Sequence, residues 1–164
     1  MKAVLISIQP KWCELIARGE KTLEVRKTRL KLETPFKCYI YCTFTGSNEF
    51  FRDALNGDVA AWNRGKWSER KGNVIGEFIC DRYVIDRSFG HDAVINAAAC
   101  MTEIQCASYS CGSPLYGWHI SNLKIYEKPK KLSDFTGIKT MRGGFELCEL
   151  ERPPQSWCYV TEVG

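Results

Sequence analysis

Residues 7–27 read SIQPKWCELIARGEKTLEVRK, a pattern that predicts a helix followed by a strand. Pro10 suits the first turn of a helix, because its ring fixes φ and its missing N–H needs no partner there. The apolar residues Trp12 and Ile16 follow at helical spacing. Gly19 is well placed to end the helix, since glycine adopts left-handed backbone angles at little cost.

Residues 20–28 follow this turn and alternate in polarity as a β-strand does. Leu23 and Val25 point to one face, and Glu24 and Arg26 point to the other, because side chains alternate along a strand. The sequence therefore predicts a half-buried strand whose polar face lies beside the helix.

Three charged groups belong to this polar face. Glu24 and Arg26 are separated by about 7 Å along the backbone, and Lys21 lies at the start of the strand. An arginine offers a planar fork of donors that suits phosphate or carboxylate, and a glutamate accepts hydrogen bonds from the N–H groups of a base. The three side chains either hold a ligand or form a structural ion pair that locks the strand in place, and the pattern leaves both interpretations open.

The rest of the chain predicts more strands than helices. Residues 3–8 are apolar on both faces, which is typical of a strand in the middle of a sheet. Five or six strands without a regular strand–helix alternation favour a mixed, mostly antiparallel β-barrel with flanking short helices, an α+β fold that is mainly β. The other strand patterns cover residues 36–43, 73–86, 115–127 and 155–163, short helices are expected within 48–70 and 92–111, and residues 143–144 indicate a loop.

Gly19, Lys21, Glu24 and Arg26 form the pattern Gly-x-Lys-x-x-Glu-x-Arg after a proline-started helix. This arrangement resembles the N-terminal signature of the ASCH family, a branch of the PUA-like superfamily. The resemblance is close over about the first thirty residues and looser at the strand of residues 73–86 and near the C-terminal end. It implies one PUA-like domain over residues 1–164, with insertions around 44–70 and 88–112.

The resemblance also implies a function, since ASCH and related domains are taken to bind RNA or modified nucleotides in a cleft beside the first helix. Ser7 and Gln9 offer hydrogen bonds near the start of the helix, and Trp12 is placed to stack on a base. His119 lies in a strand pattern, where it either forms hydrogen bonds on the face of the sheet or contacts the ligand. The candidate ligand residues are Ser7, Gln9, Trp12, Lys21, Glu24, Arg26 and His119.

An enzyme is the main alternative. One bacterial branch that looks like this sequence at the same motif is an amidohydrolase of N4-acetylcytidine, which uses a lysine, a threonine and a later glutamate. The lysine falls on Lys21 and the glutamate on Glu77, but the threonine position holds Glu24. A hydroxyl nucleophile would leave a covalent ester, whereas a carboxylate there would form an anhydride or act only as a base for water. Ribonuclease-type cleavage and a non-catalytic protein-interaction module also remain open.

The composition indicates which class of protein this is and in which compartment we expect it. The 164 residues are 45% hydrophobic and carry a net charge of +4, which is ordinary for a globular domain and below that of strongly basic nucleic-acid binders. No apolar run approaches the ~18 residues of a membrane span. The nine cysteines are an odd number without an export signal, which favours the reducing cytoplasm. They lack metal-ligand spacing, so we expect neither a metal nor a cofactor.

Overall fold

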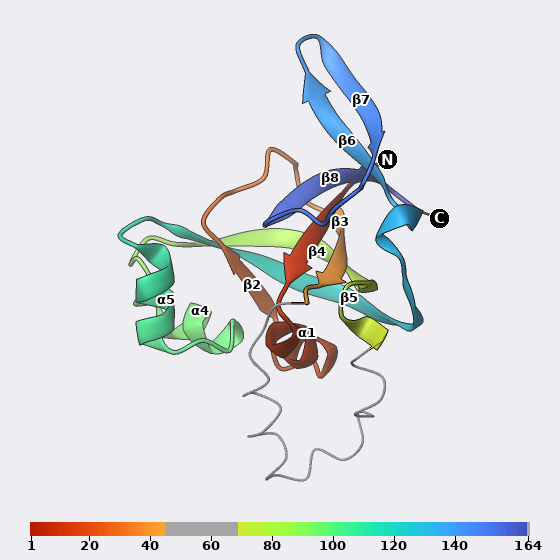
Figure 1. The fold of residues 1–164 in the computed structure, drawn as a ribbon. Coiled ribbons are helices and arrows are strands. Elements are labelled where there is room, and N and C mark those ends of the chain that lie inside the picture. The colour runs from red at the N-terminus through yellow and green to blue at the C-terminus, as the bar shows by residue number, and fades with distance from the viewer. Residues whose placement is uncertain (45–68, 164) are drawn as a thin grey trace.

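The computed structural model describes residues 1–44 and 69–163, so most of the insertion predicted at 44–70 and the helices expected within 48–70 lie outside the described residues. The helices are α1 (Pro10–Ala17), α4 (Ala93–Ala98) and α5 (Glu103–Ser110), with a 3-10 turn η1 (Leu132–Asp134) (Figure 1). Within the described ranges, none of the helices is long and apolar enough to cross a membrane. The strands are β1 (Lys2–Ile8), β2 (Leu23–Arg26), β3 (Phe36–Cys42), β4 (Val74–Asp86), β5 (Leu115–Lys130), β6 (Thr136–Met141), β7 (Gly144–Glu149) and β8 (Trp157–Thr161).

The strands of the described residues form one eight-stranded sheet in the order β2-β5-β4-β3-β1-β8-β6-β7. β1 and β3 are parallel, and the other neighbouring strands are antiparallel. The mainly-β, mixed α+β class is therefore confirmed. The prediction of a closed barrel of five or six strands is wrong, because the sheet has eight strands and ends at β2 and β7.

The two strands that the sequence did not predict, β6 and β7, form a hairpin. It projects away from the rest of the sheet (Figure 1), and most of its residues are exposed. A strand without a buried face has no reason to alternate apolar and polar residues, so the pattern there gave only the loop at Gly143 and Gly144. Gly143 has a φ of 98°, which is the left-handed geometry of the turn that joins the two strands.

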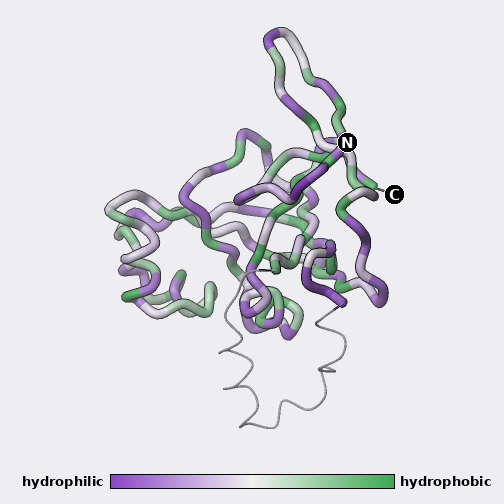
Figure 2. The backbone as a smooth tube through the Cα atoms, in the orientation of Figure 1, coloured by the Kyte–Doolittle hydropathy of each residue, from purple (hydrophilic) through white to green (hydrophobic). Residues whose placement is uncertain are grey.

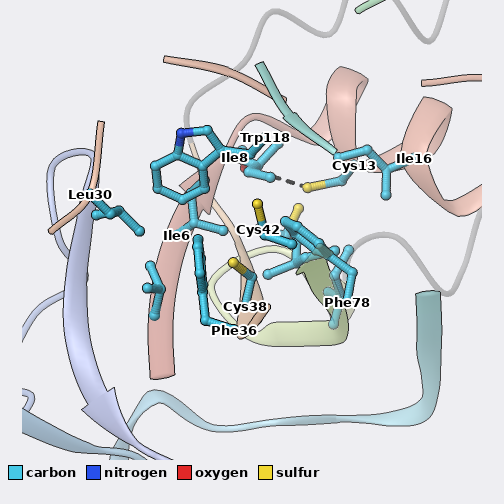
Figure 3. Close-up of a cluster of buried hydrophobic side chains, with 14 residues drawn as sticks. Ile6, Ile8, Cys13, Ile16, Leu30, Phe36, Cys38, Cys42, Phe78 and Trp118 are labelled. Carbon is cyan, nitrogen blue, oxygen red and sulfur yellow. Dashed lines mark hydrogen bonds between the residues drawn. The ribbon is translucent and has the colours of Figure 1, made fainter. Parts of the chain in front are cut away.

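Both faces of β1 are buried, as its apolar pattern predicts. Ile6 and Ile8 pack on one face in a cluster that includes Trp118 and Cys13 (Figure 3). Leu5 packs on the other face in a second cluster. The tube in Figure 2 shows hydrophobic stretches along the strands in the middle of the molecule. Packing on both faces holds β1 in place. Because β1 ends at Ile8, this packing also defines where α1 begins.

α4 and α5 cover the outer face of β2, where Leu23 and Val25 pack against Ile95 and Cys106. Both helices have well-formed starts: Asp92 accepts hydrogen bonds from two backbone N–H groups at the start of α4, and Thr102 forms a capping box with Gln105 at the start of α5. The segment that the resemblance assigns to an insertion is therefore packed on the strand, against Leu23 and Val25 and so on the face opposite Glu24 and Arg26.

Candidate functional site

A cavity of about 340 Å³ opens between α1, the end of β1, β2 and α5. We call it the α1 pocket. Its volume lies in the range of small-molecule sites. Six of the seven predicted ligand residues line it: Ser7, Gln9, Trp12, Lys21, Glu24 and Arg26. The helix stop at Gly19, whose φ is 75°, folds β2 back along α1 and so brings these residues together.

Lys21 ties the pocket to α4. The residue is 3% exposed, and its Nζ donates a hydrogen bond to the carbonyl oxygen of Ala99 at 2.8 Å. The same Nζ lies 3.4 Å from Glu24 Oε2 and 5.0 Å from the centre of the Trp12 ring. A buried ammonium is costly unless it is partnered, and these contacts offset that cost. Lys21 is thus committed mainly to protein atoms.

Glu24 and Arg26 form an ion pair, with Arg26 Nη2 2.9 Å from Glu24 Oε1. The structural pairing expected as one interpretation is therefore present, and both residues also line the pocket. Glu24 Oε2 and Arg26 Nε have no hydrogen-bond partner within residues 1–44 and 69–163. Both atoms are buried, and Oε2 has the Lys21 ammonium 3.4 Å away, so the Glu24 carboxylate lies between two cations.

Arg26 also reaches across the sheet. Its Nη2 donates to the carbonyl oxygen of Ser7 at 2.8 Å, and its Nη1 donates to Ser156 Oγ at 3.1 Å. Ser7 in turn donates from its hydroxyl to the carbonyl oxygen of Pro154 at 2.6 Å. These bonds join β2, the end of β1 and the loop before β8 into one rigid rim.

Two aromatic rings line the α1 pocket. Trp12 comes from α1 and Tyr109 from α5. Burial raises the pKa of Tyr109, so its phenol stays neutral. Lys27 Nζ lies 5.0 Å from the centre of the Tyr109 ring, a cation–π contact that holds α5 against the end of β2. The pocket thus combines flat apolar surfaces with charged groups.

Glu77 does not join this site. It is absent from the residues that line the α1 pocket, and its carboxylate accepts a hydrogen bond from the Tyr126 hydroxyl. Lys37 Nζ lies 3.7 Å from Glu77 Oε1. Glu77 pairs in register with Tyr39, which packs in the cluster on the sheet face opposite Trp118. The later glutamate of the amidohydrolase pattern is therefore not brought to Lys21.

His119 also lies apart from the pocket. Its Nδ1 is 2.6 Å from Asp81 Oδ1, and its backbone position pairs with Leu23. This histidine links β4 and β5 on the sheet rather than facing the charged residues of β2.

Four polar or large pocket residues were not among the predicted ligand residues: Thr43, Met101, Tyr109 and Gln155. Thr43 follows β3, and Met101 lies between α4 and α5. Tyr109 lies in α5, and Gln155 precedes β8. Because these residues are far apart in the sequence, no local pattern connects them. For Gln155 the sequence held a partial indication, because the two prolines before it stiffen the chain where it enters the last strand. Among the residues that the structure describes, no group of three His, Cys, Asp or Glu side chains is placed to hold a metal ion.

No protein-family model and no curated protein matches the sequence. The fold is similar to the crystal structure of an ASCH protein from Zymomonas mobilis, with a TM-score of 0.57 and 18% identity over 98% of this chain and 88% of that chain. A serine-to-alanine variant of the Zymomonas mobilis protein has a TM-score of 0.55 and 18% identity over 98% of this chain and 89% of that chain. A tyrosine-to-phenylalanine variant has a TM-score of 0.54 and 17% identity over 99% and 92%. The resemblance to the ASCH family is thus confirmed at the level of the fold.

Proposed function

We propose that this chain is an ASCH-type domain that binds RNA or a modified nucleotide in the α1 pocket. The observation that carries the proposal is the meeting of Glu24 and Arg26 with the rings of Trp12 and Tyr109 around one cavity. Proteins recognise unpaired bases by stacking them on aromatic rings and by hydrogen bonds to the base edges. The pocket offers both kinds of group, and the shared ASCH fold makes the same ligand class the natural expectation.

Each side chain has a distinct part in the proposed site. Trp12 and Tyr109 supply faces for a planar base, and the carboxylate of Glu24, which lines the pocket, suits a base N–H. Arg26 supplies positive charge for a phosphate, although its guanidinium is partly used by Ser7 and Ser156. Lys21 holds the carboxylate of Glu24 in place from behind.

Binding without turnover fits the geometry better than amide hydrolysis. The second carboxylate of the amidohydrolase pattern, Glu77, hydrogen-bonds Tyr126 on the other face of the sheet. Glu24 is the remaining carboxylate at Lys21, and its Oε1 is paired with Arg26. Its Oε2 lies 3.4 Å from Lys21 Nζ, so each carboxylate oxygen has a cation beside it. We therefore assign Glu24 to ligand recognition.

The test measures binding of fluorescein-labelled single-stranded oligoribonucleotides by anisotropy, over a series of salt concentrations. Trp12→Ala removes a stacking surface that is only half-buried, and Glu24→Gln removes the carboxylate charge while keeping its size. Glu146→Gln on the exposed hairpin strand β7 is the matched control. We expect Trp12→Ala and Glu24→Gln to weaken binding about tenfold or more, because a base–aromatic stack or a charged hydrogen bond is lost.

Two outcomes would contradict the proposal. One is the absence of binding at low salt, where phosphate contacts are strongest. The other is equal affinity in all three variants, each shown by circular dichroism to be folded. Consumption of N4-acetylcytidine by the wild-type chain, lost in a Glu24→Gln variant that still binds it, would favour the amidohydrolase instead.

A further inference from the structure

A second cavity adjoins the α1 pocket. Its volume is about 570 Å³, and we call it the proline pocket. Gln155 lines both cavities, so the short loop before β8 is the wall between them. The side chains that matter below are Arg152, Pro153, Pro154, Gln155 and Trp157.

The wall is fixed to the rest of the site. The Ser7 hydroxyl donates to the carbonyl oxygen of Pro154 at 2.6 Å, and the Ser7 backbone N–H donates to the carbonyl oxygen of Ser156 at 2.9 Å. Arg26 Nη1 donates to Ser156 Oγ at 3.1 Å. Residues on both sides of Gln155 are therefore bonded to β1 or β2, and the two cavities keep a constant relation to each other.

The proline pocket has the chemistry of a nucleotide subsite. Trp157 is half-buried, and its ring is held edge-on to Tyr159 at 5.3 Å between ring centres. Its Nε1 donates to Thr28 Oγ1 at 3.4 Å, which fixes the ring further. Arg152 is exposed, and it is the charged member among the described residues of the lining. A tryptophan and an arginine in the lining of one cavity suit a base and its phosphate.

We propose that the proline pocket takes the nucleotide next to the one held in the α1 pocket. The inference rests on the proposed function and extends it, since the ligand becomes a single-stranded stretch of at least two nucleotides. The strand crosses Gln155, whose exposed amide can donate to the linking phosphate. Arg152 then contributes charge on the far side of the wall from Arg26.

The experiment compares dinucleoside monophosphates with ribonucleoside 3′- and 5′-monophosphates by isothermal titration calorimetry. Each probe carries one phosphate group, so a gain for the dinucleotides reports the second nucleoside. The proteins are the wild-type chain, Arg152→Ala, and the matched control Arg142→Ala in the exposed turn of the β6–β7 hairpin. We expect the best dinucleotide to bind at least about tenfold more tightly than the best mononucleotide.

The two arginine variants show which cavity is responsible for the tighter binding of dinucleotides. We expect Arg152→Ala to lose most of the gain while its affinity for mononucleotides stays that of the wild type, and Arg142→Ala to change neither. Equal affinity for mono- and dinucleotides, or equal effects of the two arginine variants, would overturn the inference and leave the α1 pocket as a mononucleotide site. Failure of both kinds of probe to bind would overturn the proposed function along with it.

Discussion

Arg26 Nη2 and the carbonyl oxygen of Ser7 lie 2.8 Å apart, although three strands separate β2 from β1 in the order of the sheet. The sheet therefore curls until β2 comes back to the end of β1. A closed barrel would join these strands by backbone hydrogen bonds, whereas here an arginine side chain crosses the gap. The opening that remains between the two strands is where the α1 pocket lies.

Replacement of this arginine tests the bridge. Arg26→Lys keeps the charge but cannot reach Glu24, Ser7 and Ser156 together, because an ammonium lacks the planar fork. We expect the free energy of unfolding in urea to fall by about 2 kcal/mol, in line with the loss of hydrogen bonds to a charged donor. Arg142→Lys in the hairpin turn is the control and should change stability little. Equal stability of the two variants would show that the bridge does not hold the sheet.

Lys21 offers a separate test of the buried charges. Lys21→Met keeps the length of the side chain but removes the donor to Ala99 and the cation beside Glu24. We expect the free energy of unfolding to fall by about 3 kcal/mol, as is typical when one partner of a buried ion pair is removed. Chemical denaturation measures this loss. An unchanged or higher stability would mean that the ammonium is not needed to hold α4 against the pocket.

Glu14 should make stability depend on pH. Burial raises the pKa of its carboxyl, against the opposing effect of Arg18, and Glu14 Oε2 has no hydrogen-bond partner in the described part of the chain. The folded state thus binds the proton more tightly than the unfolded state does. The resulting stabilisation is complete below the unfolded pKa and is lost as the pH rises through the folded pKa.

The matching variant is Glu14→Gln, which resembles the protonated side chain. We expect it to be more stable than the wild type at pH 7, with the difference shrinking as the pH falls through the raised folded pKa and staying small below about 4.5, the ordinary glutamate value. Thermal melts from pH 3.5 to 7.5 measure the difference, with Glu146→Gln as the control. A difference that grows towards low pH would contradict this assignment.

The cysteines should differ sharply in reactivity. Cys111 is exposed, whereas Cys13, Cys38, Cys42, Cys80 and Cys106 are buried. Burial raises the pKa of Cys80 to about 12, and thiolates rather than thiols react. With an aromatic disulfide reagent at pH 8, we expect Cys111 to react fastest and Cys111→Ser to remove that phase. Rapid labelling of Cys13 or Cys38 in the folded chain, seen by peptide mass mapping, would contradict the described core.

The sequence predicted best those elements that have one buried face. β1, α1 and β2 follow from apolar spacing, from Pro10 and from Gly19. The hairpin of β6 and β7 was missed, since its residues are mostly exposed and carry no alternation. The closed barrel was wrong because strand patterns do not say which strands pair, and pairing depends on contacts between distant segments such as β1 and β8.

The residues of the α1 pocket also fall into those that the sequence predicted and those that it did not. Ser7, Gln9 and Trp12 are close in sequence to Lys21, and a helix followed by a turn returns the chain past them. Tyr109 and Gln155 reach the pocket only through the packing of α5 and of the loop before β8. Glu77 was assigned by resemblance alone, and its position in β4 directs it to Tyr126.

The most direct test of the central claim is a nitrogen-15 NMR titration of the labelled chain with a single-stranded oligoribonucleotide at low salt. We predict the largest chemical-shift changes at the backbone amides of Ser7, Val25, Met101 and Tyr109 and at the indole N–H of Trp12, all of which belong to the α1 pocket. Shift changes confined to the β6–β7 hairpin, or none at saturating RNA, would contradict it.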